Sequence, residues 1–129
     1  MHILVTGGTG YIGSHTVVEL VQEGHSVVVV DNLVNSSEEA LRRVAQIVGQ
    51  TIPFVKVDLC DPKQVEAFFA SQEKPFDCCM HFAGLKAVGE SVAQPLRYYR
   101  NNLDSTMLLA EAMGRHGCKN IIFSSSATV

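Results

Sequence analysis

The sequence predicts an α/β protein built on a doubly wound parallel sheet. Short apolar runs alternate with longer stretches of helical period along all 129 residues, and this alternation favours parallel strands joined by right-handed helical crossovers. Ser26–Val30 carries four consecutive valines, which is typical of a strand covered on both faces. We expect about five strands in the order 3-2-1-4-5, with helices on both faces of the sheet.

The first half of the chain places three elements around the valine strand. Ile3–Thr6 is the first expected strand, and a glycine-rich turn separates it from a helix over Tyr11–Glu23. Gly24 suits the position just beyond the end of that helix. After a polar loop, Ser37 is the predicted N-cap of a helix over Glu38–Val48, whose apolar residues fall on one face.

The second half repeats the same alternation. Asp61 followed by Pro62 is a helix-start signal, and the helix is expected to run through Ala70. Residues 83–94 contain two glycines and precede Pro95, so we expect a loop with at most a short helix. The remaining elements are strands at Pro53–Val57, Phe76–Phe82 and Lys119–Phe123 and a helix at Leu96–Met113.

Composition excludes several classes of protein. Apolar residues make up 47% of the chain and charged residues 18%, which is incompatible with a disordered chain. The net charge is −3 and no basic block is present, so nucleic-acid binding is disfavoured. No apolar run approaches the roughly 20 residues of a membrane span, and the N-terminus lacks the pattern of a secretory signal. We expect a cytoplasmic protein.

Four cysteines are present, and two of them, Cys78 and Cys79, are adjacent. We interpret them as reduced, buried thiols. A metal site built from Cys79 and His81 is the alternative, but no second pair of ligands has zinc spacing. We therefore predict no metal centre.

The first turn carries the pattern Gly7-x-x-Gly10-x-x-Gly13 between a strand and a helix. Glycine lets such a turn tighten and lets the backbone approach a pyrophosphate, while the helix N-terminus offers free N–H groups. A glycine-rich turn without a ligand is the alternative. The strand before the turn and the helix after it favour a dinucleotide site.

Two aspartates follow expected strands at positions that suit an adenosine. Asp31 comes 18 residues after Gly13, where a carboxylate accepts hydrogen bonds from ribose hydroxyls and repels a 2′-phosphate. NAD is therefore favoured over NADP. Asp58, after the third strand, can accept from the adenine amino group. The alternatives are a turn cap for Asp31 and a loop cap for Asp58.

Further candidates follow the fourth and fifth strands. The small residues after His81 let the backbone lie close to a flat cofactor, and Lys86 can reach a phosphate, unless it is an ordinary surface lysine. His81 itself is interpreted as a core histidine with its hydrogen bonds satisfied. Ser124–Ser126 lies at the ligand-binding edge of the sheet, where a hydroxyl can steer a substrate hydroxyl, although serine runs also form plain turns.

These segments together resemble the extended short-chain dehydrogenase/reductase family, and within it the epimerases. The resemblance spans the whole chain and is most specific after His81. It is carried by Val5–Thr16, Asp31-Asn32, His81–Val92, Tyr98-Tyr99, Asn101-Asn102 and Phe123–Val129.

The resemblance implies a Rossmann-like fold and an NAD-dependent isomerase of galactose metabolism, in which residues 1–129 are the N-terminal NAD-binding domain. Such enzymes interconvert UDP-glucose and UDP-galactose through hydride transfer to bound NAD and a 4-keto sugar. By resemblance, Ser126 hydrogen-bonds the reacting hydroxyl. The implied cofactor contacts are Gly7, Gly10, Tyr11, Ile12, Gly13, Asp31, Asn32, Asp58, Leu59, Phe82, Ala83, Gly84, Lys86 and Asn101.

One departure from the family pattern is large. The catalytic Tyr-x-x-x-Lys pair of the family occurs nowhere in these 129 residues, and the UDP-sugar domain is missing as well. We therefore expect the front part of a larger fold, inactive by itself and a homodimer when intact. Two alternatives stay open: another nucleotide-sugar epimerase or dehydratase, and a non-catalytic NAD-binding module.

Overall fold

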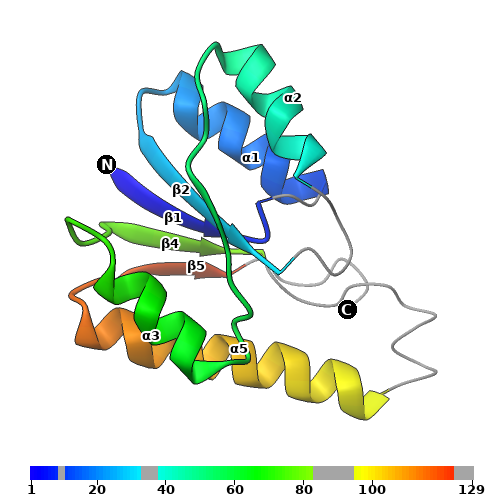
Figure 1. Ribbon diagram of the computed structural model, residues 1–129, viewed down its shortest axis with the longest axis vertical. Helices are drawn as coiled ribbons and strands as arrows, with labels where there is room; N and C mark the ends of the chain where they lie inside the picture. The colour runs from blue at the N-terminus through cyan, green and yellow to red at the C-terminus, as the bar shows by residue number, and fades with distance from the viewer. Residues whose placement is uncertain (9–10, 33–37, 83–94, 124–129) are drawn as a thin grey trace.

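The computed structural model describes residues 1–8, 11–32, 38–82 and 95–123. Within these described residues, five strands and four helices alternate, as the sequence predicts (Figure 1). The strands are β1 (His2–Thr6), β2 (Ser26–Asp31), β3 (Phe54–Lys56), β4 (Cys78–His81) and β5 (Ile121–Phe123). The helices are α1 (Tyr11–Gln22), α2 (Glu39–Val48), α3 (Pro62–Ala70) and α5 (Pro95–Arg115).

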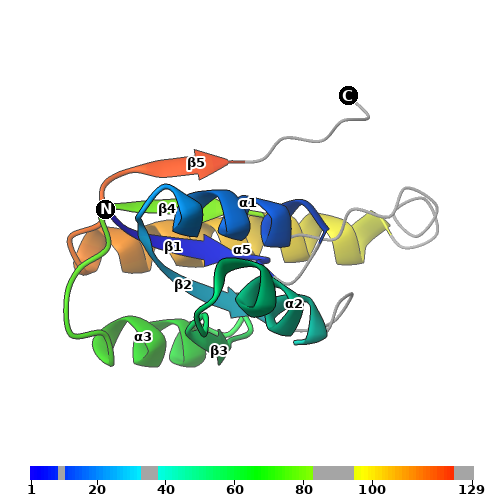
Figure 2. The ribbon, with the colours of Figure 1, turned by 90° about the horizontal axis from the view of Figure 1, so that it is seen from above.

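The strands form one parallel sheet in the order β3-β2-β1-β4-β5, which confirms the predicted topology. Figure 2 shows them in this sequence, with β5 at one edge and β3 at the other. The register pairs Thr6 with Val30 on one side and with His81 on the other, and pairs His81 with Phe123. The carboxyl ends of all five strands therefore meet at one edge of the sheet.

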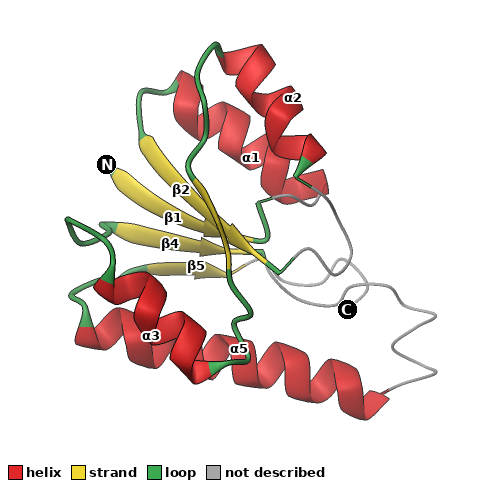
Figure 3. Cartoon of the chain, viewed as in Figure 1, coloured by secondary structure: helices red, strands yellow, loops and turns green. Residues whose placement is uncertain are grey.

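Helices cover both faces of the sheet, also as predicted. In Figure 3, α1 and α2 lie on one side of the strands and α3 and α5 on the other. Alternate residues of each strand feed two separate cores. Ile3 and Val29 pack with α1 and α2, whereas Leu4 and Val28 pack with α3 and α5. The valine run is buried throughout, because a central parallel strand is covered on both faces.

Element ends differ from the predictions by a few residues. The predicted strands 53–57, 76–82 and 119–123 are shorter in the structure. Helix α2 has Glu38 at its N-cap position without a side-chain cap bond, and the predicted cap Ser37 lies outside the described residues, as does the predicted loop 83–94. The Asp61 cap is confirmed, since its carboxylate accepts from the Lys63 amide at 3.0 Å.

An ion cluster joins the two helices that cover the second face. Glu66 of α3 accepts hydrogen bonds from Arg115, at 2.9 Å, and from His116, at 2.9 Å. These hydrogen bonds, the one from His116 first, lower the pKa of the Glu66 carboxyl. The cluster ties the end of α5 to α3 at the surface.

Two apolar surfaces stay exposed in the described part of the chain. All three residues of β5 are exposed, Ile121, Ile122 and Phe123. On α5, the outward face carries Leu96 (73% exposed) and Met107 (52% exposed). None of the described helices is long and apolar enough to cross a membrane.

Candidate functional site

The carboxyl edge of the sheet brings the predicted site segments together. The chain leaves β1 toward β2 on one side, whereas β4 pairs with the other side of β1. In open α/β sheets, ligands bind in the crevice at such a reversal of strand order. The glycine turn after β1, Asp31 at the end of β2 and Phe82 after β4 all lie at this edge.

The glycine turn is shaped by contacts that leave no room for side chains. Gly7 has φ +72°, a conformation that favours glycine, and its amide donates to the Val30 carbonyl at 2.9 Å. A Cβ added to Gly13 would lie 2.2 Å from the Gly7 carbonyl oxygen. The turn and the first turn of α1 therefore touch backbone to backbone, as the motif predicts. Gly10 lies outside the described residues.

Gly8, which is not one of the three motif glycines, is also required to be a glycine. A Cβ on Gly8 would lie 2.5 Å from Cγ1 of Val29, because the turn folds back over β2. The adjacent glycines at the end of the first strand were the available signal. Their contact partner could not be read from the sequence.

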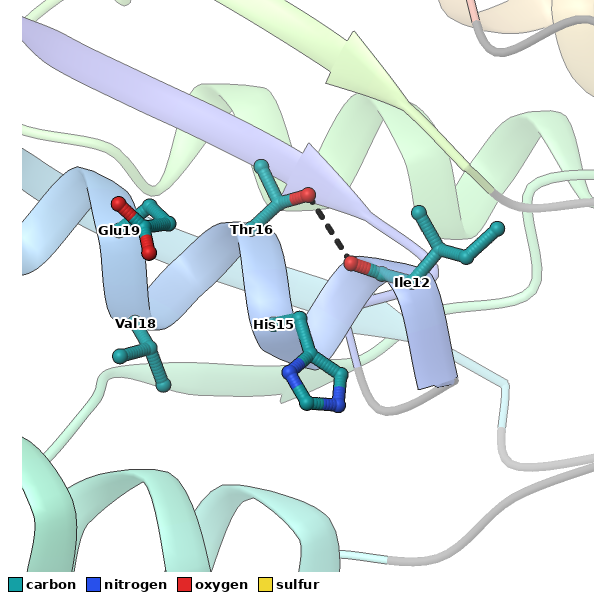
Figure 4. A pocket seen from close by; sticks show the side chains of 5 residues that line it. All are labelled: Ile12, His15, Thr16, Val18 and Glu19. Atoms are coloured by element: carbon teal, nitrogen blue, oxygen red, sulfur yellow. Dashed lines mark hydrogen bonds between the residues drawn. The ribbon is translucent and has the colours of Figure 1, made fainter.

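The N-terminus of α1 points its first amides toward this edge. Helix α1 begins at Tyr11 and has no acidic residue in its first turn, so its unpaired N–H groups and the helix dipole suit an anion. Ile12 is exposed, and Thr16 donates to its carbonyl at 2.9 Å, the dashed line in Figure 4. The side chain of Tyr11 lies outside the described residues.

A shallow hollow of about 280 Å³ runs along the outer side of α1 (Figure 4). It is lined by Ile12, His15, Thr16, Val18 and Glu19. Ile12 is the one predicted cofactor residue among them. The glycine turn, and not this hollow, therefore defines the candidate site.

Asp31 ends β2 and Asn32 follows it, and both are half-buried at the same edge. Asp31 pairs in register with Lys56, and its carbonyl accepts from the Val57 amide at 3.0 Å. The backbone of Asp31 is thus held by β3. A carboxylate at the end of the second strand, beside a glycine turn, is the arrangement that binds ribose hydroxyls.

Asp58 caps its own loop. Its Oδ1 accepts from the Cys60 amide at 2.9 Å, and its own amide donates to Oε1 of Gln64 at 2.9 Å. A carboxylate has about four lone-pair sites, so this cap is compatible with the predicted adenine contact. The side chain of Leu59 is buried in the core beneath α3, so a cofactor contact at this residue falls to its backbone.

The end of β4 carries a buried polar residue. His81 is 2% exposed, and its ring is hydrogen-bonded through Nδ1 to Thr6 Oγ1 at 2.5 Å and through Nε2 to Thr106 Oγ1 at 3.2 Å. This confirms the interpretation of His81 as a satisfied core histidine. Phe82, which follows it, is half-buried, and its amide donates to the Thr6 carbonyl at 2.9 Å.

Several predicted site residues lie outside the described part of the chain. They are Ala83, Gly84 and Lys86, the side chain of Asn101, and Ser126. Asn101 belongs to α5, and Ser126 comes three residues after β5. Their predicted contacts stay predictions.

The cysteines offer no reactive thiolate. None of the four forms a disulfide. Burial raises the pKa of all four thiols, most strongly for Cys79, which is fully buried on β4. Among the described residues there is no cluster of three or more histidine, cysteine or acidic side chains that could hold a metal ion.

Known proteins resemble the chain over its whole length. A family model described as "NAD dependent epimerase/dehydratase family" matches residues 3–129. The chain is 59% identical over 129 residues to a UDP-glucose 4-epimerase of Bacillus subtilis and 56% identical over 128 residues to one of Neisseria meningitidis. These alignments cover 100% and 99% of this chain but 38% and 37% of the relatives.

Solved structures give the same result. UDP-glucose 4-epimerase from Bifidobacterium longum, in complex with NAD+ and UDP, superposes with a TM-score of 0.93 at 51% identity. The enzyme from Stenotrophomonas maltophila, with bound NAD and formylated UDP-arabinopyranose, gives 0.92 at 45% identity. Each superposition covers 100% of this chain and 38% of the other. The chain thus spans little more than a third of the length of these relatives.

Proposed function

Because the chain belongs to the NAD dependent epimerase/dehydratase family, we propose that residues 1–129 are the NAD-binding part of a UDP-glucose 4-epimerase. The observation that carries the proposal is the backbone contact between the glycine turn and α1, with Asp31 beside it. A Cβ at Gly13 would collide with the Gly7 carbonyl, so the turn keeps open a cradle of backbone amides. The identities to UDP-glucose 4-epimerases support the choice of reaction.

The residues present fit the cofactor. The turn at Gly7 and the α1 N-terminus hold the pyrophosphate of NAD, and Asp31 accepts from the ribose hydroxyls. When bound, NAD supplies the acceptor and later the donor of a hydride. The further predicted cofactor contacts are Gly10, Tyr11, Ile12, Gly13, Asn32, Asp58, Leu59, Phe82, Ala83, Gly84, Lys86 and Asn101.

The substrate side of the site involves the end of β5. In our proposal, the hydroxyl of Ser126 hydrogen-bonds the 4-hydroxyl of UDP-glucose or UDP-galactose. Support comes from the parallel register of Phe123 with His81, since the chain then leaves β5 at the edge that carries the glycine turn. The 129 residues contain no Tyr-x-x-x-Lys pair, so the chain alone has no base for this hydroxyl and is expected not to turn over the sugar.

We further propose that the intact protein is a homodimer. The exposed residues Leu96, Leu103, Met107 and Gly114 recur at helical spacing along the outward face of α5. In a two-fold antiparallel pairing of two α5 helices, Leu103 meets Met107 and the large Leu96 meets Gly114. Such self-complementarity is what a two-fold interface requires. A cytoplasmic location is proposed from the four free cysteines.

Calorimetric titration of the chain with NAD and with NADP tests the cofactor assignment. We expect NAD to bind more tightly. Asp31→Ala is expected to weaken NAD binding by about tenfold or more, because hydrogen bonds to a charged group contribute about 1.5–3 kcal/mol. The same change is expected to reduce the difference in affinity between NAD and NADP. Asp77→Ala is the matched control, since Asp77 lies at the opposite edge, where its carboxylate accepts from the His2 amide at 2.7 Å. Equal affinity of the unmutated chain for both dinucleotides refutes the assignment.

A further inference from the structure

Few polar side chains are buried in the described part of the chain. The buried ones are Thr6, His81 and Ser105, and two of them, Thr6 and His81, pair in register at the carboxyl ends of β1 and β4. Burying a polar group is costly unless its hydrogen bonds are satisfied. Apolar residues would fill this space without that cost. A directional role is therefore a better explanation of these polar side chains than packing.

The imidazole of His81 bridges three elements. Its Nδ1 lies 2.5 Å from Thr6 Oγ1 on β1, and its Nε2 lies 3.2 Å from Thr106 Oγ1 on α5. The ring also contacts Phe123 on β5, with 5.4 Å between the ring centroids. Each hydroxyl can donate or accept, so a neutral ring satisfies both bonds at once. The ring thus fixes β1, β4 and α5 relative to one another.

Two of the bridged elements, β1 and β4, run directly into the candidate site. Thr6 precedes Gly7, whose turn approaches the α1 N-terminus. His81 precedes Phe82, whose amide is bonded to the carbonyl of the same Thr6 at 2.9 Å. Hydrogen bonds are directional, so two such bonds on one planar ring constrain how the ends of β1 and β4 are oriented.

We propose that His81 is a positioning residue for the dinucleotide site, holding the glycine turn and the exit of β4 in the arrangement that binds the cofactor. The inference rests on the proposed function for its ligand. It predicts that removing the two hydrogen bonds of the ring weakens NAD binding even when the chain remains folded.

Four variants separate positioning from stability, measured by NAD titration and thermal unfolding of the chain. His81→Leu removes both bonds, and His81→Asn keeps a hydrogen-bonding atom near the Nδ1 position. Cys79→Ala is the matched control, because Cys79 is fully buried on the same face of β4 two residues earlier. Thr106→Val breaks one bond and replaces His81→Leu if that variant does not fold.

We expect His81→Leu to weaken NAD binding by about tenfold, which corresponds to 1.4 kcal/mol, and Thr106→Val to act in the same direction. His81→Asn is expected to restore affinity to within about threefold of the unmutated chain. Cys79→Ala is expected to lower the unfolding midpoint with little change in affinity. The proposal is overturned if His81→Leu binds NAD as tightly as the unmutated chain, or if Thr106→Val does so when it is used in place of His81→Leu. It is also overturned if Cys79→Ala loses as much NAD affinity as His81→Leu.

Hydrogen exchange without cofactor tests the same inference independently of NAD. The amides of Gly7 and Phe82 are expected to exchange faster in His81→Leu, or in Thr106→Val where that variant replaces it, while the Val29 amide, bonded to the Pro53 carbonyl at 2.9 Å, keeps its protection. If the unmutated chain does not bind NAD, the proposed function fails, and the exchange result still decides the role of His81. Uniformly faster exchange across the sheet overturns it.

Discussion

Replacing Gly13 with alanine tests whether the contact between the glycine turn and α1 is as tight as its geometry indicates. The added Cβ would lie 2.2 Å from the Gly7 carbonyl oxygen and 2.9 Å from the Gly7 carbonyl carbon. Backbone atoms must therefore separate by about 1 Å to reach an ordinary contact. Overpacking of this kind costs about 1–3 kcal/mol, which outweighs the gain of up to about 1 kcal/mol from replacing a helical glycine by alanine.

Gly114→Ala is the matched control when it is measured at a concentration where the chain is monomeric, because Gly114 is also helical but has no atom of its own chain within 4 Å of its added Cβ. Urea unfolding followed by circular dichroism is the assay. We expect the Gly13→Ala midpoint to fall and the Gly114→Ala midpoint to rise slightly. A change of 1–2 kcal/mol shifts the midpoint by roughly 1 M at ordinary urea slopes. Gly13→Ala should also weaken NAD binding. A Gly13→Ala chain as stable as its parent, with unchanged NAD affinity, refutes the reasoning.

Two further predictions concern the surface. Hydrogen bonds from His116 and Arg115 lower the pKa of the Glu66 carboxyl in the folded chain. The stability that this carboxyl contributes is therefore fully present above the unfolded pKa of about 4.5. It is lost as the pH falls through the lower pKa of the folded chain. The urea midpoint of Glu66→Gln should therefore approach that of the unmutated chain between pH 6 and pH 3, and a constant difference contradicts this. The exposed apolar residues of β5 and α5 should make the chain self-associate in light scattering, and Met107→Glu should reduce the dimer fraction. A sharply melting monomer at high concentration would contradict the role given to these surfaces.

The order of the strands could be predicted from the sequence, but their ends could not. The valine run and the alternation of strands with helices identify a parallel sheet independently of its detailed contacts. The end of a strand depends on its partner. The sequence predicts one strand over residues 76–82, whereas β4 covers only Cys78–His81, because its ladder is limited by the five residues of β1.

In the candidate site, too, the sequence predicts local features but not contacts between distant segments. The pattern of Gly7 and Gly13 is local, so the sequence shows it directly. The requirement for Gly8 arises from its contact with Val29, and the Thr6–His81 bond joins residues 75 positions apart. The sequence predicted that His81 is satisfied, yet its partners depend on the register of β1 with β4. Contacts between distant segments are fixed only when the sheet assembles.

The central position of β1 has a consequence for synthesis on the ribosome. β1 is made first, pairs with β2 soon afterwards, and meets its other neighbour only when β4 has emerged at residue 81. At about 5–20 residues per second, that interval lasts roughly 4–15 s. During this time an apolar strand has one unpaired flank, which is a template for pairing with another chain. During this period the unpaired side of β1 can pair with another nascent chain, which a bound chaperone would prevent, or wait for β4 of its own chain.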